Sequence, residues 1–428
     1  MKNINRWFFL SLCLWLIIPV FAEARAEMHV PLLQQEPAFH KEDMQNISEQ
    51  DASISVSTDG RHSYKTKEGI EIISYVDTWP ESRLREVAEE LYRNRHGIEI
   101  EYLARVEIYP GKEQSGNERV SASYDMELHE INIPVDLSGF LPADYRIKVP
   151  LEKGVIRIYR GEEKTEIEDL AIVLSHEYGH HFTFFHFDEN FTSDKYKEST
   201  YYKVRRLYQY PEVNGEASYD ERIHRWSIFE IAAEDYHQLL GSPTGKKTTR
   251  YLDISQKMGS PTYQRINTAS REDYNAIPQE NWNIPLASQV EGLYEYFISF
   301  LNEEPDATVM NMLSDPEDTD MPVLSYRVEE EFNFKRYIIE WNEAAAEDSE
   351  KPVYTLVAFD NENRLIPIKT VFPGEKTFAV VGTVTQIIDS YIYYYQDGLD
   401  RGSLDFRLYI QYPDGWVTAS EDLTVNFN

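Results

Sequence analysis

Cysteine is almost absent from this sequence of 428 residues, and the only one is Cys13. Cys13 lies within the apolar run 7–22, so a chain that has lost this run contains no cysteine and forms no disulfide. A lipid anchor at Cys13 is excluded as well, because Leu12 stands where an acylation site needs a small residue. Stability must therefore come from packing and from bound metal.

Positive charge is also scarce. The chain has 42 Lys and Arg against 74 Asp and Glu, which gives a formal net charge of -32. Nucleic-acid binding needs clustered cations that displace phosphate counterions, so the composition argues against a nucleic acid as partner. The acidic excess identifies no substrate, because solubility through self-repulsion explains it.

The apolar run at the amino terminus is short. It follows a positively charged start and ends in alanines at alternate positions, which are the three parts of a secretory signal peptide. A membrane-spanning helix needs about 20 apolar residues, so an uncleaved anchor is the weaker alternative. We expect residues 1–26 to be a signal peptide and the mature protein to be secreted or associated with the cell surface, without stable membrane insertion.

The remainder divides by pattern into four parts. Residues 27–74 are polar and lack periodicity, which predicts a linker or a pro-segment. Residues 75–303 combine amphipathic helices with short strands. Two helices are expected after the capping boxes that begin at Thr78 and Thr165, and two more at 226–240 and 286–301. The strands are expected at 102–109, 131–137 and 155–159. Residues 304–322 are acidic and proline-punctuated, hence a linker between domains.

From residue 323 to residue 428 the apolar period becomes two, which predicts an all-β sandwich with a core of its own. The pairing of Ile339-x-Trp341 with Phe406-x-Leu408-x-Ile410 resembles fibronectin type III domains, which have an immunoglobulin-like fold. Such a domain can bind a substrate, the cell wall or a surface partner. The resemblance identifies no ligand.

The stretch His176-Glu177-Tyr178-Gly179-His180 carries the chemistry. Two histidines four residues apart project from nearly one face of a helix and can hold one zinc ion. Glu177 lies about 100 degrees round the helix, where it can take the proton of a zinc-bound water that attacks a peptide bond. The alternative is a chance spacing of two histidines on a surface helix.

A second acidic helix lies downstream of this motif. Glu230 and Glu234 are one turn apart within an apolar run, and unpaired buried carboxylates are costly. Both acids are satisfied if Glu230 ligates the zinc and Glu234 accepts the outer ring hydrogen of a ligating histidine. The alternative is an amphipathic helix whose acids face water.

His176, Glu177, His180 and Glu230 together resemble the gluzincin metallopeptidases, and in spacing the group of anthrax lethal factor and the Pro-Pro endopeptidases. The resemblance covers about residues 75–303. It implies one zinc ion, endopeptidase activity on a protein or peptide, and an α+β domain with a small mixed sheet, an active-site helix and a mainly helical subdomain. It also implies a tyrosine that supports the oxyanion, for which Tyr219 is the candidate.

Two other interpretations remain open at this stage. The protein could be a metzincin that uses His186 as third ligand, although Thr183 stands where that family has a helix-ending glycine. It could also be an extracellular binding or adhesion protein with a structural or decayed zinc site. The presence of Glu177 argues against decay, because a structural site needs no general base.

Overall fold

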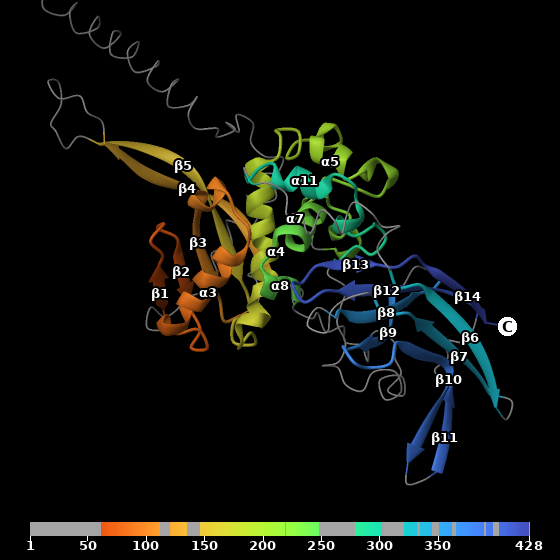
Figure 1. Ribbon diagram of the computed structural model, residues 1–428. Coiled ribbons are helices and arrows are strands. Elements are labelled where there is room, and N and C mark those ends of the chain that lie inside the picture. Colours follow the sequence, from red (N-terminus) through yellow and green to blue (C-terminus); the bar gives the residue numbers. More distant parts are fainter. Residues whose placement is uncertain are drawn as a thin grey trace, which may run out of the picture.

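A computed structural model of the chain describes residues 61–111, 120–134, 146–218, 220–247, 279–301, 303, 321–331, 334–344, 351–361, 365–388, 391–396 and 402–427. They form an α+β structure with a mixed sheet, a layer of helices and two antiparallel sheets (Figure 1). The expected signal peptide, nearly all of the expected linker 304–322 and the candidate Tyr219 lie outside the described residues.

The first sheet has five strands in the order β1-β2-β3-β5-β4. The strands are β1 (His62–Lys65), β2 (Glu71–Ser74), β3 (Leu103–Ile108), β4 (Ala122–Pro134) and β5 (Arg146–Ile158). Strands β2, β3 and β5 run parallel, and antiparallel β1 and β4 lie at the two edges. The boundary expected at residue 75 is therefore wrong, because β1 and β2 fall within the predicted linker 27–74 and belong to this sheet.

The inner face of this sheet is apolar, and the outer face carries a group of ion pairs beside the buried residues Ile73 and Val155. Ile72, Val106 and Ile156 are fully buried on the inner face, where they join the core formed with the first two long helices. On the outer face Arg105 and Arg157 pair with Glu107. Charged side chains on the outer face are typical of a sheet that helices cover on one side only.

Helices α3 (Glu81–Arg93) and α4 (Ile167–His186) cover the inner face. Both begin later than the capping boxes predicted. Pro80 precedes α3 while Thr78 donates a hydrogen bond to the Gly161 carbonyl, and the backbone N–H of Glu166 at the start of α4 donates to Asp169. Helix α4 lies between the sheet and the remaining helices (Figure 1).

The helical layer contains α5 (Thr200–Val204), α6 (Glu221–His224), α7 (Ile228–Leu240), α8 (Pro243–Lys247) and α11 (Leu293–Ile298). Short 3-10 turns are η2 (Ile98–Tyr102), η3 (Tyr196–Glu198), η4 (Leu207–Gln209) and η6 (Ala287–Gln289). The helix expected at 226–240 is α7. The continuous helix expected at 286–301 is wrong, because Gly292 adopts a left-handed conformation (φ 80°) that separates η6 from α11.

The carboxyl-terminal residues form two antiparallel sheets, ordered β11-β10-β7-β6 and β13-β12-β8-β9, with β14 pairing to β12. Their strands are β6 (Leu324–Glu331), β7 (Phe334–Trp341), β8 (Val353–Phe359), β9 (Leu365–Val371), β10 (Phe378–Ile388), β11 (Tyr391–Gln396), β12 (Gly402–Gln411), β13 (Val417–Ala419) and β14 (Leu423–Phe427). Ile339 on β7 of one carboxyl-terminal sheet and Leu356 and Phe406 on β8 and β12 of the other are fully buried in one shared core.

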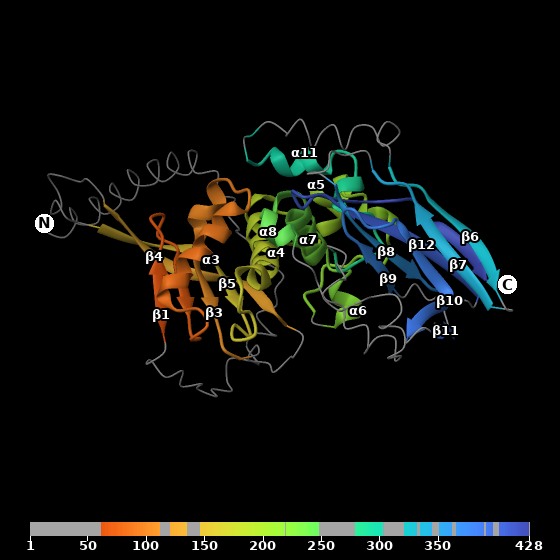
Figure 2. The same ribbon diagram turned by 60° about the horizontal axis from the view of Figure 1, so that its bottom comes forward.

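This carboxyl-terminal region is not independent of the rest. Trp416 is 3% exposed and lies in the core of the helical layer, with its ring 6.0 Å from that of Tyr294. Ser288 donates to the Val417 carbonyl, and Gln411 donates to the Lys246 carbonyl. The expectation of a separate core is therefore only partly right. Figures 1 and 2 show the helical layer between the first sheet and the carboxyl-terminal sheets.

Within the described ranges, no helix has the length and apolar character needed to cross a membrane.

Candidate metal centre

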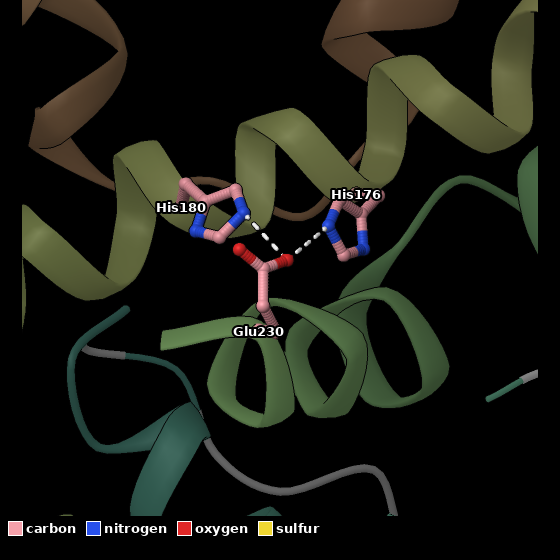
Figure 3. Close-up of side chains that lie close together, drawn as sticks. All are labelled: His176, His180 and Glu230. Carbon is pink, nitrogen blue, oxygen red and sulfur yellow. Dashed lines mark hydrogen bonds and ion pairs between the residues drawn. The ribbon is translucent and has the colours of Figure 1, made fainter. Parts of the chain in front are cut away.

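Two helices bring three ligand side chains together. His176 and His180 project from α4, and Glu230 projects from the first turn of α7 toward both (Figure 3). The Nε2 atoms of His176 and His180 lie 3.2 Å and 3.3 Å from the same carboxylate oxygen, Oε2 of Glu230. The three ligand atoms all lie within 4.8 Å of one another.

The two nitrogen-to-oxygen distances have the size expected between ligands of one tetrahedrally coordinated metal ion. Ligand atoms about 2.1 Å from zinc at tetrahedral angles are about 3.4 Å apart. The two nitrogen-to-oxygen separations of 3.2 Å and 3.3 Å are close to this value. Two imidazoles and one carboxylate also leave a fourth position open, as catalytic zinc sites do.

A glycine allows the two helices to approach. A Cβ atom at Gly179 would lie 2.6 Å from the carbonyl oxygen of Ala233 on α7, closer than side-chain carbons come to backbone. The residue inside the histidine motif is therefore glycine because the backbone of α7 occupies the space of a side chain. Close approach at Gly179 places Glu230 within reach of the histidines, since Ala233 is less than one turn away on α7.

Glu234 lies behind the cluster, one turn after Glu230. Its Oε1 atom is 3.4 Å from Nδ1 of His176, so the two nitrogens of this ring face two different carboxylates. An outer carboxylate on the second ring nitrogen orients a ligating histidine and raises its basicity. The sequence predicted that Glu234 accepts the outer ring hydrogen of a ligating histidine, and its carboxylate lies beside that ring nitrogen.

The electrostatics of the cluster depend on its burial. Burial alone would lower the pKa of His176, but the neighbouring carboxylates of Glu230 and Glu234 raise it well above its usual value. Burial alone would raise the pKa of Glu230, but the charge of His180 and the hydrogen bonds from both histidines hold it well below its usual value. Without metal the three side chains thus share charge and protons, a role that a divalent cation would take over.

Glu177 lies beside these residues and is not one of the converging three. Its side chain is 6% exposed, and its Oε2 atom has no hydrogen-bond partner within the described part of the chain. Burial raises its pKa. A buried acid without a partner is costly, so such a group in a native protein points to a function.

His186 takes no part in the cluster. Helix α4 continues through Thr183 to His186, whose Nε2 atom is 2.7 Å from Oε2 of fully buried Glu99. Tyr178 and the backbone N–H of Gly97 donate to the same carboxylate. The geometry therefore removes the support for His186 as third ligand, on which the metzincin interpretation depended.

Two residues near the cluster were not expected. The ring of His224 on α6 lies between Oε2 of Glu280, 2.8 Å from Nδ1, and Oε1 of Glu230, 3.5 Å from Nε2. Tyr124 on β4 donates to or accepts from His181, and its ring stacks 6.4 Å from that of His180. His224 and Tyr124 belong to no sequence motif. Each contacts residues that lie more than 50 positions away in the sequence, so no local pattern could identify them. For the tyrosine that supports the oxyanion, the sequence suggested Tyr219 and not Tyr124.

The chain was compared with models of known protein families, with curated proteins and with solved structures, and none of them matches it.

Proposed function

We propose that this protein is a secreted zinc endopeptidase. The observation that carries the proposal is the convergence of His176, His180 and Glu230 within 4.8 Å, next to Glu177, whose buried Oε2 atom has no hydrogen-bond partner among the described residues. Convergence of ligand atoms and a neighbouring general base are the two requirements of zinc-assisted hydrolysis. The same residues carry the resemblance to the gluzincins, and the carboxyl-terminal sheets carry the resemblance to fibronectin type III domains.

In this proposal His176, His180 and Glu230 hold the metal, and Glu234 orients His176. When bound, zinc polarises the peptide carbonyl and allows water to act as a nucleophile near neutral pH. Glu177 accepts the proton of the attacking water and delivers it to the leaving amine. Its raised pKa, which burial causes, suits a group that must both take up and release a proton.

The position of β4 suggests how a peptide would bind. β4 is the last strand of the described sheet, and Tyr124 on this strand stacks against the candidate ligand His180. An extended peptide can add to such an edge through main-chain hydrogen bonds, which would carry it past the cluster. The proposed substrate is therefore an extended segment of a protein or peptide.

The variant Glu177→Gln tests the proposal. It removes the base and keeps the side-chain volume, so we expect the wild-type content of zinc and a loss of peptide cleavage of about 100-fold to 10,000-fold. Cleavage of a peptide library and metal analysis of the purified protein give the two readouts. Glu291→Gln, a matched change at an exposed acid that pairs with Arg206, serves as control.

Wild-type cleavage by Glu177→Gln would contradict the mechanism. Absence of both zinc and cleavage in the wild-type protein would contradict the function itself. That outcome would favour the alternative of an extracellular binding protein.

A further inference from the structure

Met126 brings an exposed sulfur atom close to the candidate metal centre. It lies on β4, two residues after Tyr124, and its side chain is 42% exposed. Side chains two residues apart on a strand point to the same face, and the Tyr124 ring stacks 6.4 Å from the ring of His180. Exposed thioethers are accessible to oxidants, which convert them into polar sulfoxides. Met126 is therefore an oxidisable group that contacts a neighbour of the candidate ligand His180.

The hydroxyl of Tyr124 has one hydrogen and two acceptors. Its oxygen lies 2.8 Å from the sulfur of Met126 and 3.0 Å from Nδ1 of His181. The other nitrogen of this ring, Nε2, is 2.8 Å from the carbonyl oxygen of Glu99, and a carbonyl can only accept, so Nε2 carries a hydrogen. Burial favours the neutral ring of His181, in which Nδ1 is then an acceptor. Because a thioether is the weaker acceptor, the hydroxyl donates to His181.

The backbone of β5 limits the movement of both rings. Gly154 lies opposite Met126 in the pairing of β4 with β5. A Cβ atom at Gly154 would lie 2.6 Å from Nδ1 of His181 and 2.7 Å from the ring atom Cε2 of Tyr124. The two rings thus meet directly against backbone. The contact between Tyr124 and His181 has little room to adjust when a neighbouring group changes.

A sulfoxide at Met126 changes the competition for the hydroxyl hydrogen. Its oxygen is a much stronger acceptor than the thioether sulfur, and it competes with Nδ1 of His181 for the hydrogen of Tyr124. The separation of 2.8 Å between the Tyr124 oxygen and the sulfur leaves no space for another atom between them. Formation of the new hydrogen bond therefore requires the side chain of Tyr124 or Met126 to shift.

We propose that Met126 is an oxidation site at which peroxides lower the activity of the candidate centre, through Tyr124 and its contacts with His180 and His181. The sulfur forms a bond to one peroxide oxygen, the O–O bond breaks and water leaves, so the sulfur loses two electrons and the peroxide gains them. This inference rests on the proposed function and adds a reversible control to it, because reductases convert the sulfoxide back to the thioether.

Hydrogen peroxide treatment of the zinc-loaded protein, followed by peptide mapping with mass spectrometry, tests the site itself. We expect Met126 to be oxidised several-fold faster than Met321, which is half-buried and packs against the core of the carboxyl-terminal sheets. Equal rates at the two methionines, or slower oxidation of Met126, would overturn the assignment of the site.

Peptide cleavage by the same samples tests the consequence. Oxidation of wild type should lower cleavage by about tenfold, the lower end of the effects of residues that support a metal ligand. Met126→Leu keeps an apolar side chain that peroxide does not oxidise, so it should cleave like wild type before and after treatment. Met126→Gln, whose amide oxygen replaces the sulfoxide oxygen, should show the loss without peroxide. Met321→Leu is the matched control and should remain as sensitive as wild type.

A second readout does not depend on turnover. Loss of the hydroxyl hydrogen bond leaves the buried Nδ1 of His181 without its donor, which is costly. The unfolding midpoint of the metal-free protein should therefore fall by a few degrees when wild type is oxidised, and should not change when Met126→Leu is treated. Tyr124→Phe has no hydroxyl, so peroxide should alter neither its midpoint nor its rate of cleavage, whatever that rate is.

The outcomes separate this inference from the proposed function. A wild-type enzyme that keeps its activity and midpoint with Met126 oxidised overturns the inference alone. An equal loss of activity in treated Met126→Leu also overturns it, because the target would then be another group. Recovery of wild-type cleavage after incubation with methionine sulfoxide reductases supports the reversible control. A wild-type protein without zinc or cleavage overturns both proposals.

Discussion

Helix α4 carries two clusters of histidines and acids that differ in how their polar atoms are used. The converging cluster is His176, His180 and Glu230, and the saturated cluster is Glu99, Tyr178 and His186. In the saturated cluster both oxygens of Glu99 have donors, from Tyr178 and Gly97 on one side and His186 on the other. In the converging cluster two imidazoles approach one oxygen atom, and neighbouring Glu177 has an oxygen without a partner in the described residues.

The use of the polar atoms separates a structural cluster from a candidate functional one. Both clusters combine histidine with a glutamate that is largely shielded from solvent. The saturated cluster leaves nothing for a ligand to satisfy, and its hydrogen bonds and the charge of His186 lower the pKa of Glu99 although burial alone would raise it. Convergence of ligand atoms on one point, with an acid left over, is what a metal and a water would complete.

The change Glu230→Ala should have the largest effect on zinc affinity. It removes one of three ligands. Removal of a residue that only supports a ligand lowers metal affinity by about 10-fold to 100-fold, and we expect the zinc affinity of this variant to fall by more. Competition with a chromogenic chelator measures the affinity. Zinc retained at wild-type affinity would show that the converging cluster is not the site.

The change Gly179→Ala should weaken zinc binding through the helix contact. The new methyl group would clash with the Ala233 carbonyl, and overpacking of this kind costs about 1 to 3 kcal/mol. The clash pushes α7 and Glu230 away from the histidines. If this cost falls on metal binding, about 1 to 3 kcal/mol corresponds to a fall in zinc affinity of about 5-fold to 150-fold.

Gly245→Ala is the matched control for this change. Its methyl group would meet Ser175 and the Ala171 carbonyl, where α8 packs on α4 and α7 is not involved. It should lower the unfolding midpoint and leave zinc affinity unchanged. Equal zinc affinities in the two variants would contradict the role assigned to Gly179.

The change Glu234→Gln should cost less. It leaves all three ligands in place and weakens the carboxylate contact to Nδ1 of His176, so we expect zinc affinity to fall by about 10-fold to 100-fold. The same chelator competition measures it, with Glu291→Gln as control. A loss as large as that of Glu230→Ala would mean that Glu234 is itself a ligand.

The change His186→Ala should have the smallest effect on zinc and a large one on folding. Zinc affinity should remain within about tenfold of wild type, since His186 contacts Glu99 on the other side of α4. Unfolding by urea should show a loss of up to about 3 to 5 kcal/mol, because the buried carboxylate of Glu99 loses its ion-pair partner and keeps only the donors Tyr178 and Gly97. Loss of zinc with unaltered stability would restore the metzincin interpretation.

The sequence predicted the candidate site better than its surroundings. His176, Glu177 and His180 are local in the chain, and helical spacing alone determines that they lie close together. Glu230 and Glu234 could be found because costly carboxylates within an apolar helix demand a partner. The α+β character and the strands of the carboxyl-terminal region followed from the apolar periods. Strands β1 and β2 fell within a predicted linker because residues 27–74 are polar and lack periodicity, and four-residue strands are too short to show one.

The features that the sequence did not predict depend on contacts between segments that are distant in the chain, and apolar periodicity carries no information on such contacts. His224 meets Glu280 across 56 positions, and neither residue stands in a motif. The burial of Trp416 could be expected from its type, but its placement in the core of the helical layer could not. Gly179 reads as a variable position of the motif until α7 is seen against it.

Zinc titration of the metal-free protein decides whether His176, His180 and Glu230 hold a metal. We expect wild type, Glu177→Gln and His186→Ala each to bind one zinc ion per chain with a raised unfolding midpoint, and Glu230→Ala not to do so at the same zinc concentration. Failure of the wild type to bind zinc, or equal binding by Glu230→Ala, would contradict the assignment of these three residues.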